Sequence, residues 1–248
     1  MLSRLSDFGR ENSADMRELF LRVPVDETEQ EELSALQRED GSFSDIDYAD
    51  SNRGYWQPAM HCFRVQRLAI RYALTGDAKS LDMALGAMRY WHTHTPVCLN
   101  WWHNEIGCPR LLGPAYLLLR SHLTAEDMEG AYAVMGKATI GRSGQNKVWL
   151  AGNVLIRALL AEDYNLLLAA RNAIGEELRI GERGAGLQPD YSFHQHGRQL
   201  QFGNYGLSYA VSLSYWANVL GDTDLAFSSE KTGILVKYIR EGLGQMVH

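Results

Sequence analysis

Apolar residues recur at helical spacing along most of this chain of 248 residues. Polar residues fill the opposite faces of the same segments, which is the pattern of amphipathic α-helices. Clear strand alternation is missing, so the pattern predicts an all-α protein. The helical segments cover about residues 55–74, 81–91, 108–119, 125–135, 147–160, 166–178, 205–220 and 225–243.

Short polar stretches that stop one helix and start the next separate these segments. Gly76 and Gly221 suit left-handed caps at the ends of helices. Side chains that can accept hydrogen bonds from the first amides of the following helix are Asp77, Thr124, Asp163 and Asp222.

The helices alternate in character. Residues 146–161, "NKVWLAGNVLIRALLA", are apolar nearly all round, which indicates a helix buried on most faces. Residues 124–138, "TAEDMEGAYAVMGKA", have one apolar and one charged face, as expected of an outer helix. This alternation predicts helical hairpins in two layers around an axis, although an ordinary helical bundle fits the pattern too. We expect residues 1–248 to form a single domain.

Composition and charge exclude some partners. With 46% apolar residues the chain can bury a core without disulfide or metal cross-links, and its three cysteines imply no disulfide framework. A net charge of −6 argues against nucleic acid as a partner. No apolar run reaches the roughly 18 residues that a membrane span needs, and the first residues lack the apolar core of a secretory signal.

Three polar and aromatic segments interrupt the helices. They are "CLNWWHNEIGCPR" (98–110), "IGRSGQNK" (140–147) and "GERGAGLQPDYSFHQHGRQLQFGNYG" (181–206). Each lies at or just before the start of an inner helix. In a two-layer ring they would gather at one end of the axis, where loops held by a rigid scaffold commonly carry the chemistry.

The first two segments each offer two interpretations. Trp101 and Trp102 either pack beneath their loop or provide flat rings for stacking on sugars, with Asn100 beside them as a hydrogen-bonding group. Asn146 either caps the buried helix or directs its amide at a carboxylate near the positive end of that helix.

Paired histidines raise the possibility of a metal site. His194 and His196 form one His-x-His pair, and His92 and His94 form another. Neither HExxH nor CxxC accompanies them, so we expect histidines without a metal ligand role and no metal.

Acid–base chemistry is the other use of the third segment. Ser192, His196 and Asp190 supply the residue types of a hydrolytic triad, but no GxSxG nucleophile elbow is present. His196 with Tyr205 is a better pair, because a tyrosine beside a cation such as Arg198 or an imidazolium can give up and return a proton.

Three motifs, taken in order, resemble those of polysaccharide lyase family 8, which contains hyaluronan, chondroitin and xanthan lyases. They are "NWWHNEIGCPR", "SGQNK" and "PDYSFHQHGRQLQFGNYG". The resemblance runs from about Trp56 to the end of the chain. It implies an incomplete or small (α/α) toroid, the fold that alginate and glucuronan lyases share, and a cofactor-free enzyme whose substrate is an acidic polysaccharide.

By position, the resemblance assigns roles to single residues. Asn146 matches the asparagine that neutralises the uronate carboxylate, His196 the active-site histidine and Tyr205 the catalytic tyrosine before a glycine. The substrate-binding residues that we expect beside them are Asn100, Trp101, Trp102, His194 and Arg198.

The sequence also departs from the family pattern. Tyr191 replaces the glycine of Asp-Gly-Ser-Phe, and Phe202 stands where a tyrosine is common. The family has a further arginine and then β-sandwich domains beyond the point at which this chain ends, at His248. We therefore expect a fragment of a longer protein, or else Arg198 or another basic group in the role of that arginine. Family members are secreted or periplasmic, and the chain itself leaves the compartment open.

The implied reaction is a β-elimination that removes the C5 proton of a uronic acid and expels the oxygen at C4. Asn146 and His196 would neutralise the carboxylate. Tyr205 would act as base and acid when both groups lie on one side of the sugar. His196 would be the base when they lie on opposite sides.

Two other classes of protein remain open on the sequence alone. A glycoside hydrolase on a helical toroid would use two carboxylates, for which Asp190 and Glu105 are candidates. A non-catalytic glycan-binding module would use Trp101 and Trp102, and would bind without turnover.

Overall fold

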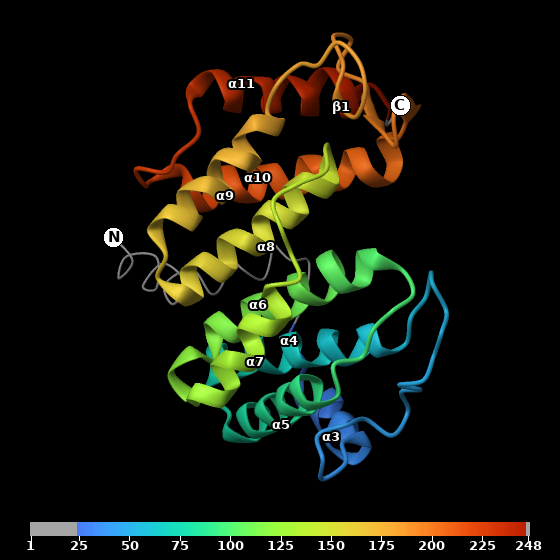
Figure 1. Ribbon diagram of the computed structural model, residues 1–248, viewed down its shortest axis with the longest axis vertical. Coiled ribbons are helices and arrows are strands. Elements are labelled where there is room, and N and C mark those ends of the chain that lie inside the picture. Colours follow the sequence, from blue (N-terminus) through green and yellow to red (C-terminus); the bar gives the residue numbers. More distant parts are fainter. Residues whose placement is uncertain (1–23, 247–248) are drawn as a thin grey trace. The chain divides into compact units, whose positions relative to one another are not determined.

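The computed structural model describes residues 24–246 and is helical in nearly all the segments that the apolar pattern predicts (Figure 1). Each predicted segment overlaps one of the helices α4 to α11, so the all-α prediction is confirmed. The helices are α3 (Glu27–Leu36), α4 (Pro58–Thr75), α5 (Ala78–His94), α6 (Cys108–Leu118), α7 (Ala125–Met135), α8 (Gln145–Ala161), α9 (Tyr164–Glu177), α10 (Leu207–Gly221) and α11 (Ser229–Lys237).

Three π-helical and two 3₁₀ turns adjoin these helices in the described residues. The π-turns are η1 (His103–Gly107), η3 (Phe202–Gly206) and η4 (Tyr238–Gly242), and the 3₁₀ turns are η2 (Arg120–His122) and η5 (Leu243–Met246). Both η1 and η3 lie within polar motifs and lead directly into α6 and α10. Such π-turns are frequent at functional sites.

The chain forms two compact units. Within the described residues, the first holds 24–138 together with Ile156–Asp163, and the second holds Thr139–Leu155 together with 164–246. The helix α8 contributes to both units. The sequence-based expectation of a single domain stays a prediction.

The helical pattern missed α3 and misplaced one set of caps. In α3 only Gln30 and Leu33 are buried, so no apolar stripe marks this helix in the sequence. The caps predicted at Gly76, Asp77 and Thr124 are confirmed. Those predicted at Gly221 and Asp222 are wrong, because α10 runs through Gly221 and the cap of α11 is Ser228, six residues after Asp222.

The first unit is a helical core built around α4. This helix packs against α5 and α6, and α7 packs against the same two helices. The largest side chains that are fully buried between them include Leu68, Met88, Trp91, Leu112, Tyr116 and Met135.

A buried histidine joins α4 to its neighbours in this unit. His61 donates from Nε2 to the carbonyl of Ala87 on α5, at 2.8 Å, and accepts at Nδ1 from the hydroxyl of Tyr48, also at 2.8 Å. The Tyr48 oxygen in turn accepts from the amide of Phe43. Burial lowers the pKa of His61 to about 4, so this imidazole is neutral at pH 7.

His61 should make the protein sensitive to acid. The unfolded histidine, with its ordinary pKa near 6.5, binds a proton more readily than the folded one. The free energy of unfolding therefore has its full value above about pH 6.5 and falls as the pH drops from there to about 4, by an amount on the order of 3 kcal/mol. His61→Gln, which retains a donor and an acceptor, should flatten this part of the profile. Urea unfolding at several pH values measures it, and equal slopes for both proteins would contradict the assignment.

The second unit contains a small sheet that the sequence did not predict. Three short antiparallel strands lie in the order β1 (Gly186–Leu187), β2 (Phe193–Gln195) and β3 (Gln199–Leu200). Leu187 pairs with Phe193, and Gln195 pairs with Gln199. Strands of two or three residues are too short to leave a readable alternation, which explains why the pattern missed them.

Aromatic side chains anchor this sheet. Phe193 of β2 lies 4.8 Å from the ring of Tyr209 on α10, and Tyr209 lies 5.7 Å from Tyr238 in η4, measured between ring centroids. All three side chains are fully buried. In Figure 1 the sheet lies beside the chain that follows α11. The strand that precedes His196 is thus fixed by ring packing from two helical segments.

Among residues 24–246, no helix is both long and apolar enough to cross a bilayer. The first 23 residues, in which the sequence shows no apolar secretory core, lie outside the part of the chain that the structure describes.

Candidate active site

Asn146 lies at the start of α8 but does not cap it. The helix begins at Gln145, and the carbonyl of Gly144 accepts the first helical bond, from the amide of Val148 at 3.3 Å. Asn146 is 5% exposed, and its Oδ1 has no hydrogen-bond partner among the described residues. Of the two roles that the sequence left open, the capping role is therefore excluded, and the carboxamide is not consumed by the helix.

Side chains from distant segments cap α8 instead. The amide of Gln145 donates to Gln195 Oε1 at 3.0 Å, and Gln195 Nε2 donates to the carbonyl of Ser143 at 3.3 Å. The amide of Gly144 donates to the carboxylate of Glu177 at 2.8 Å. Gly144 has a left-handed φ of 61°, and a Cβ there would collide with Gln195 Oε1. Glycine is therefore required at this position.

A tight hairpin presents His196. Because Gln195 pairs with Gln199, the loop between β2 and β3 consists of His196, Gly197 and Arg198. His196 has a φ of 56°, a left-handed conformation that histidine adopts more readily than most residues. Gln195 is buried, whereas His196 and Arg198 are exposed.

Tyr205 lies in η3, against His196. Their ring centroids are 5.0 Å apart, and the rings meet edge to face at 89°. The ring of Trp149 lies 5.9 Å from Tyr205, and Trp149 is one helical turn beyond Asn146 on the same face of α8. The structure thus brings His196 and Tyr205 together and turns the Asn146 face of α8 toward them.

The acidity of Tyr205 differs from the sequence-based expectation. Partial burial raises the pKa of Tyr205 above its ordinary value near 10. The lowering that we expected from Arg198 or from His196 is not found, because desolvation disfavours the phenolate at this position. Tyr205 is therefore a protonated phenol near neutral pH, which suits an acid more directly than a base.

Gly206, which follows Tyr205, occupies a position that has no room for a side chain. A Cβ there would lie 2.6 Å from the hydroxyl of Tyr238 and 3.0 Å from the carbonyl of Gln201. Gly206→Ala should therefore lower the free energy of unfolding by about 1–3 kcal/mol, as overpacking does. Gly203→Ala in the same turn, where a Cβ meets nothing within 4 Å, is the matched control. Thermal melts of both variants measure the difference, and equal stabilities would refute this explanation.

His194 faces another part of the unit. It lines a cavity of about 440 Å³ together with Asp190 and Ser192, and Asn146, His196 and Tyr205 are not among the lining residues. Ser192 Oγ lies 3.4 Å from His194 Nε2. The carboxylate of Asp190 accepts from the amide of Ser192 at 2.9 Å. The triad of Ser192, His196 and Asp190 does not form, because Ser192 lies against His194. The strand β2 ends at Gln195, and His196 lies in the hairpin loop with a left-handed φ of 56°.

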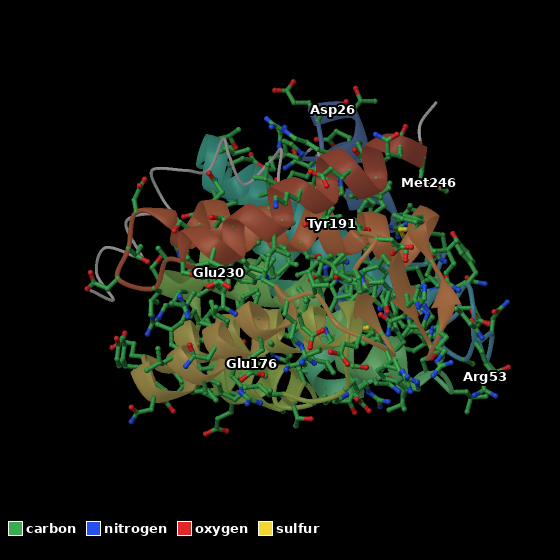
Figure 2. The ribbon with its side chains drawn as sticks, turned by 90° about the horizontal axis from the view of Figure 1, so that it is seen from above. Asp26, Arg53, Glu176, Tyr191, Glu230 and Met246 are labelled. Atoms are coloured by element: carbon green, nitrogen blue, oxygen red, sulfur yellow. The ribbon has the colours of Figure 1, made fainter. Side chains whose placement is uncertain are left out.

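Tyr191 accounts for one departure from the family pattern. Its φ is 59°, the left-handed region in which glycine is usual, and its amide donates to the carbonyl of Gln188 at 2.9 Å to close a turn. Tyr191, labelled in Figure 2, lies against Gly242, whose Cα has room for no side chain beside the Tyr191 carbonyl. A residue other than glycine in this conformation costs about 1–2 kcal/mol.

The segment 98–110, which carries Trp101 and Trp102, belongs to the first unit. Asn100 Oδ1 accepts from the amide of Trp102 at 3.1 Å, and its Nδ2 donates to the carbonyl of Arg53 at 3.0 Å (Arg53 is labelled in Figure 2). Both ends of this carboxamide are thus used by backbone groups, one in its own segment and one at Arg53. Trp101 and Trp102 are half-buried. The ring of Trp102 lies over Gly107, where a Cβ would approach to 2.9 Å.

Large apolar side chains stand in solvent around this loop. Tyr55, Val97 and Leu99 are 74%, 70% and 67% exposed. Apolar groups gathered at one surface are typical of sites that bind a partner or ligand.

Sequence reasoning missed the residues of the second unit that surround the start of α8 and Tyr205. These are Gln145, Trp149, Glu177 and Gln195. A signal for Gln195 was present, since it directly precedes His196 in the third motif. No such signal marks Glu177, which looks like one more charged residue at the end of a helix. Within residues 24–246, no group of three or more His, Cys, Asp or Glu side chains is placed to hold a metal ion.

An imidazole and a phenol in contact, together with a carboxamide at the start of a buried helix, are groups that can hold and transfer a proton, here on a mainly helical scaffold. The chain belongs to polysaccharide lyase family 8. Residues 9–248 match the family model described as the N-terminal alpha-helical domain of these proteins.

Known proteins support the same assignment. The chain is 33% identical over 235 residues to chondroitinase-AC of Pedobacter heparinus, covering 90% of this chain and 33% of that protein. It is 31% identical over 141 residues to xanthan lyase of Bacillus sp. (strain GL1), covering 52% of this chain and 15% of that protein. A solved structure of chondroitinase AC lyase matches with a TM-score of 0.82 at 30% identity, over 96% of this chain and 36% of that one.

These matches confirm the predicted fold and family. The structural match covers nearly the whole chain, so the (α/α) toroid fold predicted from the sequence is confirmed. The chain spans about a third of the length of the chondroitinase-AC that it matches.

Proposed function

We propose that this chain carries the acid–base residues of a polysaccharide lyase that cleaves a uronic-acid-containing polysaccharide by β-elimination. The observation that supports it most is the contact of His196 with Tyr205, at 5.0 Å between ring centroids, beside the Asn146 face of α8. An imidazole and a phenol in contact can take and give a proton on one sugar ring.

Neutralising the uronate carboxylate is the first requirement of this chemistry. The C5 proton is very weakly acidic while the carboxylate keeps its negative charge. Donors placed to meet the charge that develops there commonly supply the largest share of the rate enhancement. Asn146 fits this role, because its carboxamide is not used for capping and the amides at the start of α8 add positive potential.

Proton transfer and bond breaking follow from the same three residues. A base removes the proton at C5, the electron pair forms the C4–C5 double bond, and the C4 oxygen leaves with a proton from Tyr205. The raised pKa of Tyr205 keeps this phenol protonated and suits the acid role. When the C5 proton and the C4 oxygen lie on one side of the sugar, the deprotonated Tyr205 is the base, and it passes the proton that it takes to the C4 oxygen. When they lie on opposite sides, His196 is the base.

The polymer that we propose is of the chondroitin type. Chondroitinase-AC shares 33% identity over 90% of this chain, more than the xanthan lyase shares over its shorter match. Because the chain has a net charge of −6, a polyanion must meet local positive charge. Arg198, exposed in the same three-residue loop as His196, provides a cation there.

The glycoside hydrolase alternative is less well supported. A general acid of a hydrolase needs a raised pKa. Hydrogen bonds from Ser192 instead lower the pKa of Asp190, one of the two carboxylates that this alternative requires.

The products distinguish the three classes of function. The intact protein is incubated with chondroitin, hyaluronan, xanthan, alginate and glucuronan, and the ultraviolet absorbance of an unsaturated uronate is followed. Each cleavage by a lyase gives one fragment with that absorbance, lighter by one water than the corresponding hydrolysis product. Saturated fragments would establish a hydrolase, and binding without fragments a glycan-binding module. Either result would overturn the proposal.

A further inference from the structure

We infer that Gln145 and Gln195 form a positioning pair that holds Asn146, His196 and Tyr205 in register. The inference rests on the proposed function and goes beyond it, because neither glutamine is placed to touch a sugar. Gln145 is 0% exposed and Gln195 is 3% exposed. The two residues act through the segments that they connect.

The first connection runs from the hairpin to α8. Gln195 Oε1 accepts from the amide of Gln145 at 3.0 Å, and Gln195 Nε2 donates to the carbonyl of Ser143 at 3.3 Å. One side chain thus bonds both sides of the turn that begins α8. Since Gln195 precedes His196 and Gln145 precedes Asn146, these bonds fix the backbones of the two proposed catalytic residues relative to each other.

The second connection runs from α8 to α10. Gln145 Nε2 donates to Ser212 Oγ on α10 at 2.9 Å, in a buried bond. The helix α10 continues directly from η3, the turn that contains Tyr205. Gln145 therefore bonds through its backbone to the hairpin of His196 and through its side chain to the helix that follows Tyr205.

A purely packing role would not require the bond between Gln145 Nε2 and Ser212 Oγ. Apolar side chains of the same shape can replace such a pair of buried side chains at little cost, and they lack direction. Gln145 Oε1 has no partner among the described residues, which is a cost that a simple packing residue would avoid. Catalysis by well-placed groups needs directional bonds that hold the three segments at fixed distances. A shift of about 1 Å in a catalytic group can lower the rate by about 10²-fold.

The test compares these glutamines with a matched one. Gln188 is also buried, and its Nε2 donates to the carbonyls of Gly184 and Gly186 without reaching α8. We expect Gln195→Ala and Gln145→Ala to lower kcat by about 10–100-fold with KM little changed. Gln188→Ala should cost comparable stability and leave kcat near that of the wild type. An equal loss of kcat in Gln188→Ala would overturn the inference.

A double-mutant cycle asks whether the pair acts through Asn146. If Gln195 works by placing Asn146, then Gln195→Ala should lose most of its effect on kcat in an Asn146→Ala background. Additive effects would show that Gln195 acts elsewhere. Ser212→Ala is a milder change to the same connection, because it removes a single hydroxyl and is less disruptive to folding. It should lower kcat less than Gln145→Ala does.

Hydrogen exchange tests the pair without any turnover. Gln195→Ala frees the amide of Gln145, so exchange in peptides covering residues 143–148 should become faster, whereas Gln188→Ala should leave it unchanged. Unchanged exchange in Gln195→Ala contradicts the positioning pair even in an active enzyme. A wild-type protein that cleaves no polyuronate contradicts the proposed function instead, so the two failures are distinguishable.

Discussion

Tyr205→Phe is expected to lower kcat by about 10²–10⁴-fold on the uronate polymer that the intact protein cleaves, the range associated with loss of a general acid or base. The substitution removes the hydroxyl and keeps the ring that packs against His196 and Trp149. KM should therefore change little, because the ring still holds its neighbours. Initial rates from the absorbance of unsaturated product measure both constants.

Tyr191→Phe is the control for this change. Tyr191 is a half-buried tyrosine of the same unit, outside the contact between His196 and Tyr205. It should keep the wild-type rate. Full activity in Tyr205→Phe would reject the acid role, and equal losses in the two variants would indicate a general structural effect.

Asn146→Ala is expected to lower kcat by about 10²–10³-fold, the usual cost of losing one donor at a developing charge. Asn146→Asp should be worse at neutral pH, since a carboxylate of nearly the same shape repels the carboxylate of the substrate. The loss should fall on kcat more than on KM, because the donor matters most when charge develops in the transition state. Steady-state kinetics of both variants, on one polymer, provide the measurement.

A second asparagine of α8 offers the comparison. Asn153 is 1% exposed and lies about two helical turns beyond Asn146. Asn153→Ala also removes a buried carboxamide from α8 and should lower stability while sparing kcat. Asn146→Ala with wild-type kcat would remove carboxylate neutralisation from the proposed mechanism.

Local sequence patterns predicted the helices for physical reasons. Periodic burial marks α4 to α11, and short side chains that bond to free amides mark caps such as Asp77. The burial of α8 could also be predicted, because its sequence is apolar nearly all round. The helix α3 could not, since it buries few side chains.

The candidate site was predictable only in part. Motif order predicts roles for Asn146, His196 and Tyr205. The structure places the rings of His196 and Tyr205 in contact, and the roles stay predictions. The cap of α8 was not predictable, because it comes from Gln195, 50 positions along the chain from Gln145. The pKa of Tyr205 was missed for a similar reason, since partial burial, which the sequence does not show, outweighs the nearby cation.

The short hairpin that carries His196 also restricts how this segment can change in length. Adjacent residues of a strand point to opposite sides, so Phe193, His194 and Gln195 alternate along β2, and His196 follows directly as the first residue of the loop. Inserting or deleting one residue between Phe193 and His196 would exchange inside for outside and withdraw the cap from α8. Engineering of this loop should therefore keep the spacing from Phe193 to His196 intact, and keep Gly197, whose φ of 84° disfavours a side chain.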